Sequence, residues 1–363
     1  MVLQGIDVFL ENEYIRYKDK KIGLIINFSF VTADMRDALG EITEKLNIVK
    51  IFTPEHGLYG LPDGKEYSDS IHPLYKIPVI SLYGENKKPS AEMLEGIDCL
   101  IYDIQDVGLR FYTFIYTLAY CLEAASENGK EFVVLDRINP LGRTVQGNRI
   151  KYNSFVGGYK LPVRYGLTPG ELAGYYVKLM NLRVSLKVIK CKNYNGEAFP
   201  ETGLKWNVPS PNLPEFSNVI AYSGNCFFEG TNFSEGRGTT KPFLYIGAPW
   251  LDNGELFSEL NKKNIPVRKR EFIPLFSKYS GELCHGIEFF PDENNNFIKI
   301  SFFILRYLTK YDEFEFNERI KTLSGFEKEE IINFTGFSGE ELEEYKTFCK
   351  DILIYNKELK TDV

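Results

Sequence analysis

The chain has 363 residues, more than a single hydrophobic core usually serves, so two domains are expected. Its formal net charge of -7 and the absence of a Lys/Arg block argue against a nucleic-acid partner, because such binding depends on clustered cations. No run of about 18 apolar residues occurs, so membrane insertion is not expected.

The six cysteines are scattered without a CxxC pair, which fits buried free thiols better than a zinc site or a disulfide framework. The first residues, "MVLQGIDVFLENEY", lack the basic, apolar and cleavage regions of a signal peptide. A cytoplasmic location is therefore expected for the sequence as it stands, and a secreted one if an N-terminal signal has been removed.

In the first half, short β-rich apolar runs alternate with helical patterns, which predicts βαβ units around a mainly parallel sheet. Strands are expected at residues 21–27, 48–53, 77–83, 98–104, 131–136 and 186–191. Helices are expected at residues 33–46, 89–95, 112–128 and 168–181. The last of these helices opens with Thr168 as N-cap, Pro169 at the first helical position and Glu171 at the capping-box position.

Pro and Gly become dense from residue 196 to residue 249, and helical periodicity disappears there. Beyond this stretch we expect a strand at 297–305 and an acidic helix near 338–356. The prediction is an α/β protein with a Rossmann-like sheet domain over 1–225 and a smaller α+β domain over 226–363.

Polar side chains follow the ends of the predicted strands. In an open α/β sheet, ligands bind outside the carboxyl ends of the strands, so these side chains are candidates for a site. Turn and cap residues are the alternative explanation, because loops are rich in Asn, Asp, Gly and Pro. The candidates are Asn27, Glu55, His56, Tyr83, Asp103, Gln105, Asp106, Arg110, Tyr112, Asp136, Arg137 and Asn139.

Nucleotide-binding motifs are missing, since the first strand runs into "NFSFVTADM" without a GxGxxG pattern. A metal site built from Glu55, His56 and Asp106 is an alternative, but the chain has only three His and no HExxH. We therefore expect neither metal nor cofactor. Several carboxylates with Arg, Tyr and Asn suit glycosidic hydrolysis, in which one carboxylic acid protonates the leaving oxygen.

Six motifs then carry a family resemblance that spans nearly the whole chain. The chain resembles the exo-β-N-acetylmuramidases of peptidoglycan turnover, glycoside hydrolase family 171. The motifs are "PEHG" (54–57), "SLYG" (81–84), "DIQDVGLRFYT" (103–113), "LDRINP" (135–140), "PSPNLP" (209–214) and "FEGTNFSEGRGTTKPF" (228–243).

The resemblance implies a Rossmann-like domain, a smaller C-terminal domain and an active-site cleft between them. It also implies release of a non-reducing terminal N-acetylmuramic acid from peptidoglycan-derived saccharides. Glu55 is the leading catalytic acid by this analogy, with His56 and Asp106 as the other catalytic candidates. The predicted substrate-binding residues are Asn27, Tyr83, Gln105, Arg110, Tyr112, Arg137, Tyr165, Asn212, Glu229, Asn232, Glu235 and Arg237.

Two departures from the family pattern bear on mechanism. Tyr165 stands where the family usually has a His, and Ile138 replaces a Pro. A Tyr keeps a hydrogen bond but, with a reference pKa of about 10, does not shuttle protons near neutrality without a large shift. We expect a non-covalent route, and the sequence does not identify the second catalytic group.

Two alternative functions are a hydrolase of another amino sugar and an inactive sugar-binding protein. For Glu229, Glu235 and Arg237 the alternative is a structural salt-bridge loop.

Overall fold

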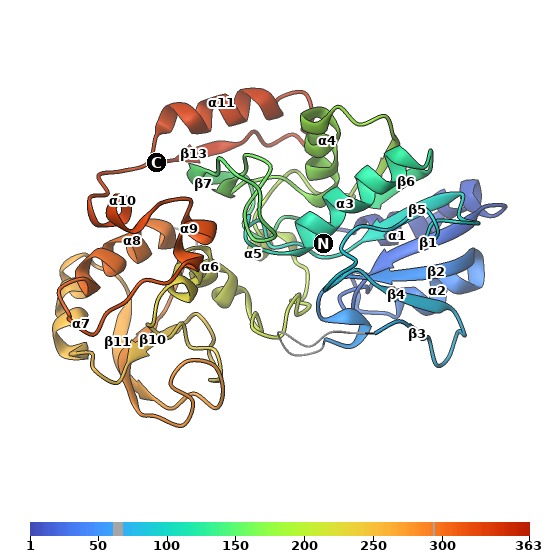
Figure 1. Ribbon diagram of the computed structural model, residues 1–363. Helices are drawn as coiled ribbons and strands as arrows, with labels where there is room; N and C mark the ends of the chain where they lie inside the picture. Colours follow the sequence, from blue (N-terminus) through green and yellow to red (C-terminus); the bar gives the residue numbers. More distant parts are fainter. Residues whose placement is uncertain (61–67, 293–294) are drawn as a thin grey trace. The chain divides into compact units, whose positions relative to one another are not determined.

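The structure is a computed structural model and describes residues 1–60, 68–292 and 295–363 (Figure 1). These residues form two compact units. Unit 1 comprises Met1–Thr144, Tyr165–Pro211 and Glu344–Lys360, and unit 2 comprises Val145–Arg164, Asn212–Glu343 and Thr361–Val363. The domain boundary expected at residue 225 and the cleft expected between the domains stay predictions.

Unit 1 is built around a seven-stranded sheet in the order β3-β4-β2-β1-β5-β6-β9 (Figure 1). Every neighbouring pair is parallel except β3 with β4. The strands are β1 (Lys21–Ile26), β2 (Asn47–Thr53), β3 (Ser70–Ile71), β4 (Pro78–Ser81), β5 (Cys99–Asp103), β6 (Glu131–Leu135) and β9 (Ser185–Ile189). The predicted α/β class with a mainly parallel sheet is confirmed.

The strand order reverses at β1, which pairs with β2 on one side and with β5 on the other. Ile26 at the end of β1 is in register with Asp103 at the end of β5. In a sheet of this kind the crevice between two such strand ends is where ligands bind. The residues after β1 and β5 are therefore the first place to look for a site.

The helices of unit 1 bury apolar faces against this sheet. Ile6 and Phe9 of α1 and Ile42 of α2 pack in one core cluster with the strand residues Leu24 and Ile101. Helices α3 and α4 pack against each other and against β6. The helices are α1 (Gly5–Glu11), α2 (Ala38–Lys45), α3 (Phe114–Glu127), α4 (Pro169–Met180) and α5 (Phe199–Thr202), with short 3₁₀ turns η1 (Glu13–Tyr17) and η2 (Gly57–Tyr59).

The sequence correctly placed most of these elements. The predicted capping box of α4 is present, because the Thr168 hydroxyl accepts from the Glu171 N–H and Glu171 Oε2 accepts from the Thr168 N–H. The helix predicted at 89–95 is wrong. Only one turn forms there, with the Leu94 N–H bonded to the Ser90 carbonyl, and Gly96 at φ +73° redirects the chain into β5.

Unit 2 contains two small sheets and a set of helices. One sheet has the antiparallel order β10-β12-β11 and the other the order β13-β7-β8. The strands are β7 (Thr144–Arg149), β8 (Pro162–Arg164), β10 (Tyr245–Ala248), β11 (Val267–Phe272), β12 (Cys284–Phe289) and β13 (Lys360–Asp362). The helices are α6 (Phe216–Asn225), the 3₁₀ turn η3 (Cys226–Gly230), α7 (Asn253–Lys262), α8 (Phe297–Leu308), α9 (Arg319–Ser324) and α10 (Lys328–Ile332). The last helix, α11 (Gly339–Cys349), begins in unit 2 and ends in unit 1.

The strand predicted at 297–305 is wrong, because this segment forms α8. The Asn296 side chain accepts a hydrogen bond from the Lys299 N–H and so starts the helix. The buried positions of α8 are spaced three and four apart, as a helix requires: Phe297, Ile298, Ser301, Phe302, Ile304, Leu305 and Leu308. The acidic helix expected near 338–356 is present as α11, but it is shorter than predicted and ends at Cys349.

None of the helices among the described residues has the length and apolar character needed to cross a membrane.

Candidate active site

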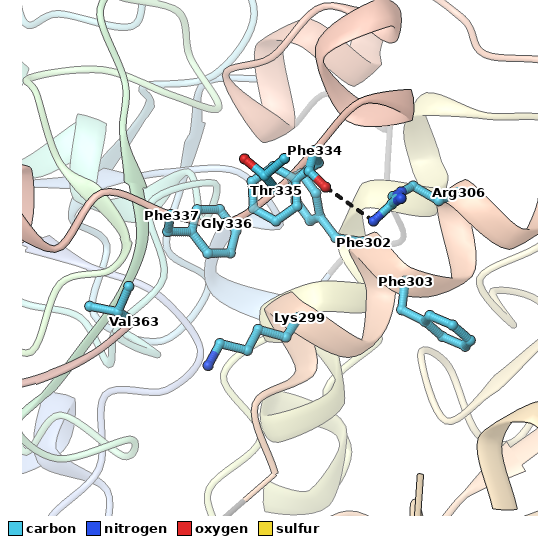
Figure 2. Close-up of a pocket in the computed structure, with 9 residues that line it drawn as sticks. All are labelled: Lys299, Phe302, Phe303, Arg306, Phe334, Thr335, Gly336, Phe337 and Val363. Carbon is cyan, nitrogen blue, oxygen red and sulfur yellow. Dashed lines mark hydrogen bonds between the residues drawn. The ribbon is translucent and has the colours of Figure 1, made fainter. Parts of the chain in front are cut away.

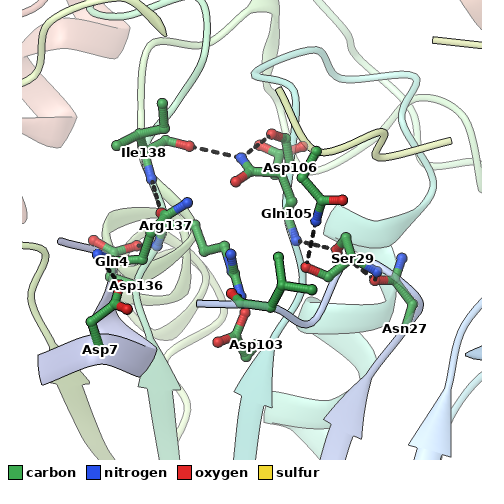
Figure 3. Close-up of polar contacts among 12 residues, drawn as sticks. Gln4, Asp7, Asn27, Ser29, Asp103, Gln105, Asp106, Asp136, Arg137 and Ile138 are labelled. Carbon is green, nitrogen blue, oxygen red and sulfur yellow. Dashed lines mark hydrogen bonds and ion pairs between the residues drawn. The ribbon is translucent and has the colours of Figure 1, made fainter. Parts of the chain in front are cut away.

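A buried polar network lies at the ends of β1 and β5 (Figure 3). Asn27 Oδ1 accepts from the N–H of Ser29 at 2.9 Å and from its hydroxyl at 2.6 Å, and Ser29 Oγ in turn accepts from the Gln105 N–H at 3.2 Å. The Gln105 amide donates to the carbonyl oxygens of Asp106 and Ile138, at 2.8 and 3.0 Å. The structure thus brings Asn27, Gln105 and Asp106 together, as predicted.

Asp106 lies at the centre of this region and is 1% exposed. Its Oδ2 accepts hydrogen bonds from the Gly108 N–H at 3.1 Å and from the Tyr165 hydroxyl. Its Oδ1 is buried and has no hydrogen-bond partner among the described residues. Burial raises the pKa of Asp106 to about 6, although the bonds from Tyr165 and from backbone N–H groups act in the opposite direction.

Glu55 and His56 follow β2 on the same sheet. Glu55 is half-buried, and its Oε2 accepts a hydrogen bond from the Thr113 hydroxyl at 2.8 Å. His56 is buried with φ at +69°, a left-handed conformation that non-glycine residues rarely adopt. Its Nε2 is 3.4 Å from Ser210 Oγ, and its ring meets the ring of Phe114 edge to face. The Glu55 carboxyl is therefore held by a neighbour, in a residue that is only partly buried.

Two of the strand-end carboxylates are structural. Asp103 and Arg137 form a buried ion pair, and Arg137 also donates to the Val31 carbonyl at 2.9 Å. Burial raises the pKa of Asp103 to about 6, and Arg137 opposes this rise. Asp136 accepts from the Gly170 N–H at 2.7 Å and from the Tyr355 hydroxyl at 2.7 Å, which fixes α4 and the C-terminal segment of unit 1.

The other candidates of unit 1 differ in burial. Arg110 is fully buried, and its carbonyl accepts from the Tyr116 hydroxyl. The Tyr112 hydroxyl donates to the Pro209 carbonyl at 2.6 Å. Tyr83 is half-buried just after β4. Their proposed contacts with substrate stay predictions.

Unit 2 holds a second cluster of charges, on the segment after η3. Glu229 accepts from Arg237 at 2.9 Å and from Arg319 at 2.8 Å. Glu235 accepts from Lys278 at 2.8 Å and lies 3.5 Å from the Arg237 Nε. Burial alone would raise the pKa of Glu229, but Arg237 and Arg319 more than offset that effect and lower it.

Three cations thus share two carboxylates in this cluster, which leaves a net positive charge. The predicted residues Glu229, Glu235 and Arg237 are brought together by the fold. Asn232 is not part of this cluster, because its side chain bonds the backbone of Glu313 and Glu315. Asn212 is buried in unit 2, and its role stays a prediction.

Comparison with known proteins identifies the family. Models of the exo-beta-N-acetylmuramidase NamZ match residues 22–217 for the N-terminal part and residues 220–355 for the C-terminal part. The chain belongs to the NamZ family. It is 42% identical over 310 residues to the peptidoglycan beta-N-acetylmuramidase NamZ of Bacillus subtilis strain 168, a match that covers 82% of this chain and 74% of that protein.

Two solved structures have the same NamZ-like fold. Both are DUF1343 family proteins from Bacteroides fragilis, and each match covers 98% of this chain and 99% of the other. One is 30% identical with a TM-score of 0.86, and the second is 28% identical with a TM-score of 0.77. The family resemblance predicted from the six motifs is confirmed.

Some contacts of this NamZ-family site were not expected from the sequence. Thr113 and Ser210 lie within the quoted motifs, where neither was singled out, yet they contact Glu55 and His56. Lys278 and Arg319 lie outside every motif, as isolated basic residues. Only the fold brings these two cations to the carboxylates of residues 229 and 235.

Residues of unit 2 line a cavity of about 370 Å³ (Figure 2). Aromatic side chains of α8 and of the segment after α10 line it, and Arg306 donates to the Phe334 carbonyl at 3.0 Å. Its described lining contains none of the predicted site residues and no carboxylate side chain, so it lacks the acid that glycosidic hydrolysis requires.

No group of three or more His, Cys, Asp or Glu side chains within residues 1–60, 68–292 and 295–363 could hold a metal ion. That the enzyme works without metal or cofactor stays a prediction.

Proposed function

We propose that this NamZ-family chain is an exo-acting glycoside hydrolase that releases N-acetylmuramic acid from the non-reducing ends of peptidoglycan fragments. The match of both family models and the 42% identity to a peptidoglycan beta-N-acetylmuramidase support this function. Neither supports any particular residue as catalytic, so the assignment of roles depends on the geometry of the site.

The proposal depends most on the position and the hydrogen bond of the Glu55 carboxyl group. It lies two residues beyond β2, at the sheet edge where ligands bind, and it is half-buried. The Thr113 hydroxyl holds one of its oxygens at 2.8 Å. A general acid needs to be fixed yet within reach of the substrate, and Glu55 combines both properties.

In the proposed reaction, Glu55 gives its proton to the glycosidic oxygen as the bond from that oxygen to the anomeric carbon breaks. A water molecule supplies the hydroxyl group to the anomeric carbon, and its remaining proton returns to the enzyme. The products are free N-acetylmuramic acid and a fragment shortened by one sugar.

Asp106 acts in this proposal as a positioning residue. Its carboxyl is 1% exposed and is held by Tyr165 and by the Gly108 N–H, which fixes the loop that follows β5. Tyr165, predicted from sequence to bind substrate, is fully buried and is better placed to hold Asp106. In this proposal, Tyr165 at the family's usual His position holds the loop that follows β5 and does not transfer a proton.

N-acetylmuramic acid differs from N-acetylglucosamine by a lactyl ether with a carboxylate, which an Arg fork can bind in two places. Arg237 is the best candidate reader, because its side chain is 19% exposed whereas Arg110 and Arg137 are buried. Its partners Glu229 and Glu235 would orient the guanidinium toward such a group.

The direct test incubates the purified protein with fragments that begin with N-acetylmuramic acid and identifies the released sugar by mass spectrometry. Proton NMR of the first-formed anomer then distinguishes retention from inversion, and we expect no glycosyl ester on the protein. Release of N-acetylglucosamine from matched fragments, with no release of muramic acid, would favour an enzyme acting on another amino sugar.

A further inference from the structure

The cavity of unit 2 joins a group of aromatic rings to two cations (Figure 2). The ring centroids of Phe302 and Phe334 are 4.5 Å apart, and those of Phe334 and Phe337 are 4.7 Å apart. Lys299 and Arg306 line the same cavity, and no acidic side chain is among its described lining residues. A mostly apolar lining with a few polar groups is the usual composition of a ligand site. We call it the aromatic cavity.

Helix α8 sets the distance between the two cations. Lys299 lies about one turn before Phe302 and Arg306 about one turn after it, so the three side chains lie on one face of the helix. The rise of an α-helix places the Cα atoms of Lys299 and Arg306 about 10 Å apart. The volume of about 370 Å³ is near the lower limit for ligand sites. The aromatic cavity therefore suits a ligand of one ring with its substituents.

Both cations remain available to a ligand. Arg306 Nη1 donates to the Phe334 carbonyl at 3.0 Å, which orients the guanidinium and uses only one of its donors. The Lys299 ammonium lies 3.9 Å from Asp362 Oδ1, too far for a hydrogen bond, and the Lys299 side chain is 49% exposed. The other oxygen of Asp362 accepts from two side-chain amides. Two cations thus face one carboxylate side chain, and the excess positive charge favours an anionic ligand.

We propose that the aromatic cavity is a second, non-catalytic binding site for an N-acetylmuramic acid residue. The choice of this sugar rests on the proposed function. Its pyranose ring has an apolar C–H face, which packs on the half-buried rings of Phe334 and Phe337. Its lactyl carboxylate forms charge-assisted hydrogen bonds with Arg306 or Lys299. The exposed Thr335 offers a hydroxyl to the polar edge of the sugar, and all of these residues belong to unit 2.

The test measures binding of two free sugars, neither of which has a glycosidic bond to cleave. Amide NMR spectra of the wild-type protein are recorded during titration with N-acetylmuramic acid and, separately, with N-acetylglucosamine, which lacks the lactyl carboxylate. We expect N-acetylmuramic acid to cause saturable shifts of the amides of residues 299–306 and 334–337. N-acetylglucosamine should bind there with an affinity lower by about tenfold or more, the usual contribution of a hydrogen bond to a charged group.

A charge reversal and a matched control test the role of the cations. Lys299→Glu should lower the affinity of these two segments for N-acetylmuramic acid by about tenfold or more. The fold should be kept, because a Glu is favourable in the first turn of a helix. Lys269→Glu makes the same change at an exposed residue of β11 that does not line the cavity, so the affinity should stay unchanged. Circular dichroism checks that both variants are folded.

Shifts confined to the residues around Glu55 would overturn the proposal, because the sugar would then bind only at the candidate active site. Equal affinity of residues 299–306 for the two sugars would also overturn it, since the carboxylate would not be recognised. If these amides respond as expected but the wild-type protein hydrolyses no chromogenic muramide, the proposed function fails and the second site stands. If the muramide is hydrolysed and these amides do not respond, only the second site fails.

Discussion

The hydroxyl of Tyr165 donates a hydrogen bond to Oδ2 of Asp106, and both side chains are buried in unit 1. The other oxygen of Asp106 has no hydrogen-bond partner among the residues that the structure describes. A buried carboxylate with so few donors is costly when ionised, which is why burial raises its pKa to about 6. The hydrogen bond from Tyr165 therefore stabilises the folded protein most when Asp106 is ionised.

The first prediction follows for Tyr165→Phe. Above pH 7 the variant should lose about 1.5–3 kcal/mol of unfolding free energy, the usual contribution of a hydrogen bond to a charged group. At pH 5 the loss should be smaller, because most Asp106 carboxyls are then neutral. Urea unfolding at both pH values measures the difference. In an Asp106→Asn background the effect of Tyr165→Phe should shrink at pH 7, and an undiminished effect would contradict the account.

The second prediction concerns pH and Asp106 itself. Its folded pKa of about 6 lies above the unfolded value, so the folded state binds the extra proton between about pH 4 and 6. Stability from this group is thus largest at low pH and falls as pH rises through that window, by about 3 kcal/mol in total. Asp106→Asn removes this dependence. The difference in unfolding free energy between wild type and variant, measured from pH 4 to 7.5, should change in that direction, and a constant difference would refute it.

The third prediction concerns the hydroxyl that holds Glu55. Thr113→Val should lower kcat about tenfold or more without unfolding the protein, because a misplaced catalytic group loses much of its effect. Thr113→Ser keeps the hydroxyl and should retain most of the rate. Steady-state kinetics with circular dichroism separates the two variants. Similar activities for the Thr113→Val and Thr113→Ser proteins would show that the contact to Glu55 at 2.8 Å does not matter for catalysis.

The fourth prediction concerns the charged cluster of unit 2. Arg237→Ala should narrow the preference for muramides over glucosaminides about tenfold or more, since a bidentate reader of the lactyl carboxylate is lost. Arg237→Lys should recover only part of it, because an ammonium lacks the planar fork. Arg319 is 57% exposed, so Arg319→Ala should cost little stability. If the Arg237→Ala protein keeps the full preference for muramides over glucosaminides, another residue binds the lactyl carboxylate.

The sequence predicted the sheet of unit 1 well because its central strands are short, largely buried and rich in β-branched residues, as in β1 and β6. It failed for α8, where "FIKISFFIL" is apolar enough to fit a strand or a helix. The helix is chosen by the Asn296 cap and by packing of Phe302 against Phe334 and Phe337, which lie more than thirty residues further along the chain.

For the site, the rule that ligands bind at strand ends correctly placed Asn27, Gln105 and Asp106 in one network. The same rule could not separate a positioning group from a structural one, and Asp136 proved to be a cap for α4. Nor could it find Lys278 and Arg319, whose partners lie 43 and 90 residues away in the chain.

The muramidase activity and the role of Glu55 are tested most directly by the rate of aryl release from a chromogenic β-N-acetylmuramide and from the matching β-N-acetylglucosaminide, for wild type and Glu55→Gln. We expect hydrolysis of the muramide by the wild-type protein, little or none of the glucosaminide, and a fall of about 100-fold or more in the muramide rate for a correctly folded Glu55→Gln protein. Equal rates on the two substrates, or wild-type turnover by Glu55→Gln, would contradict this expectation.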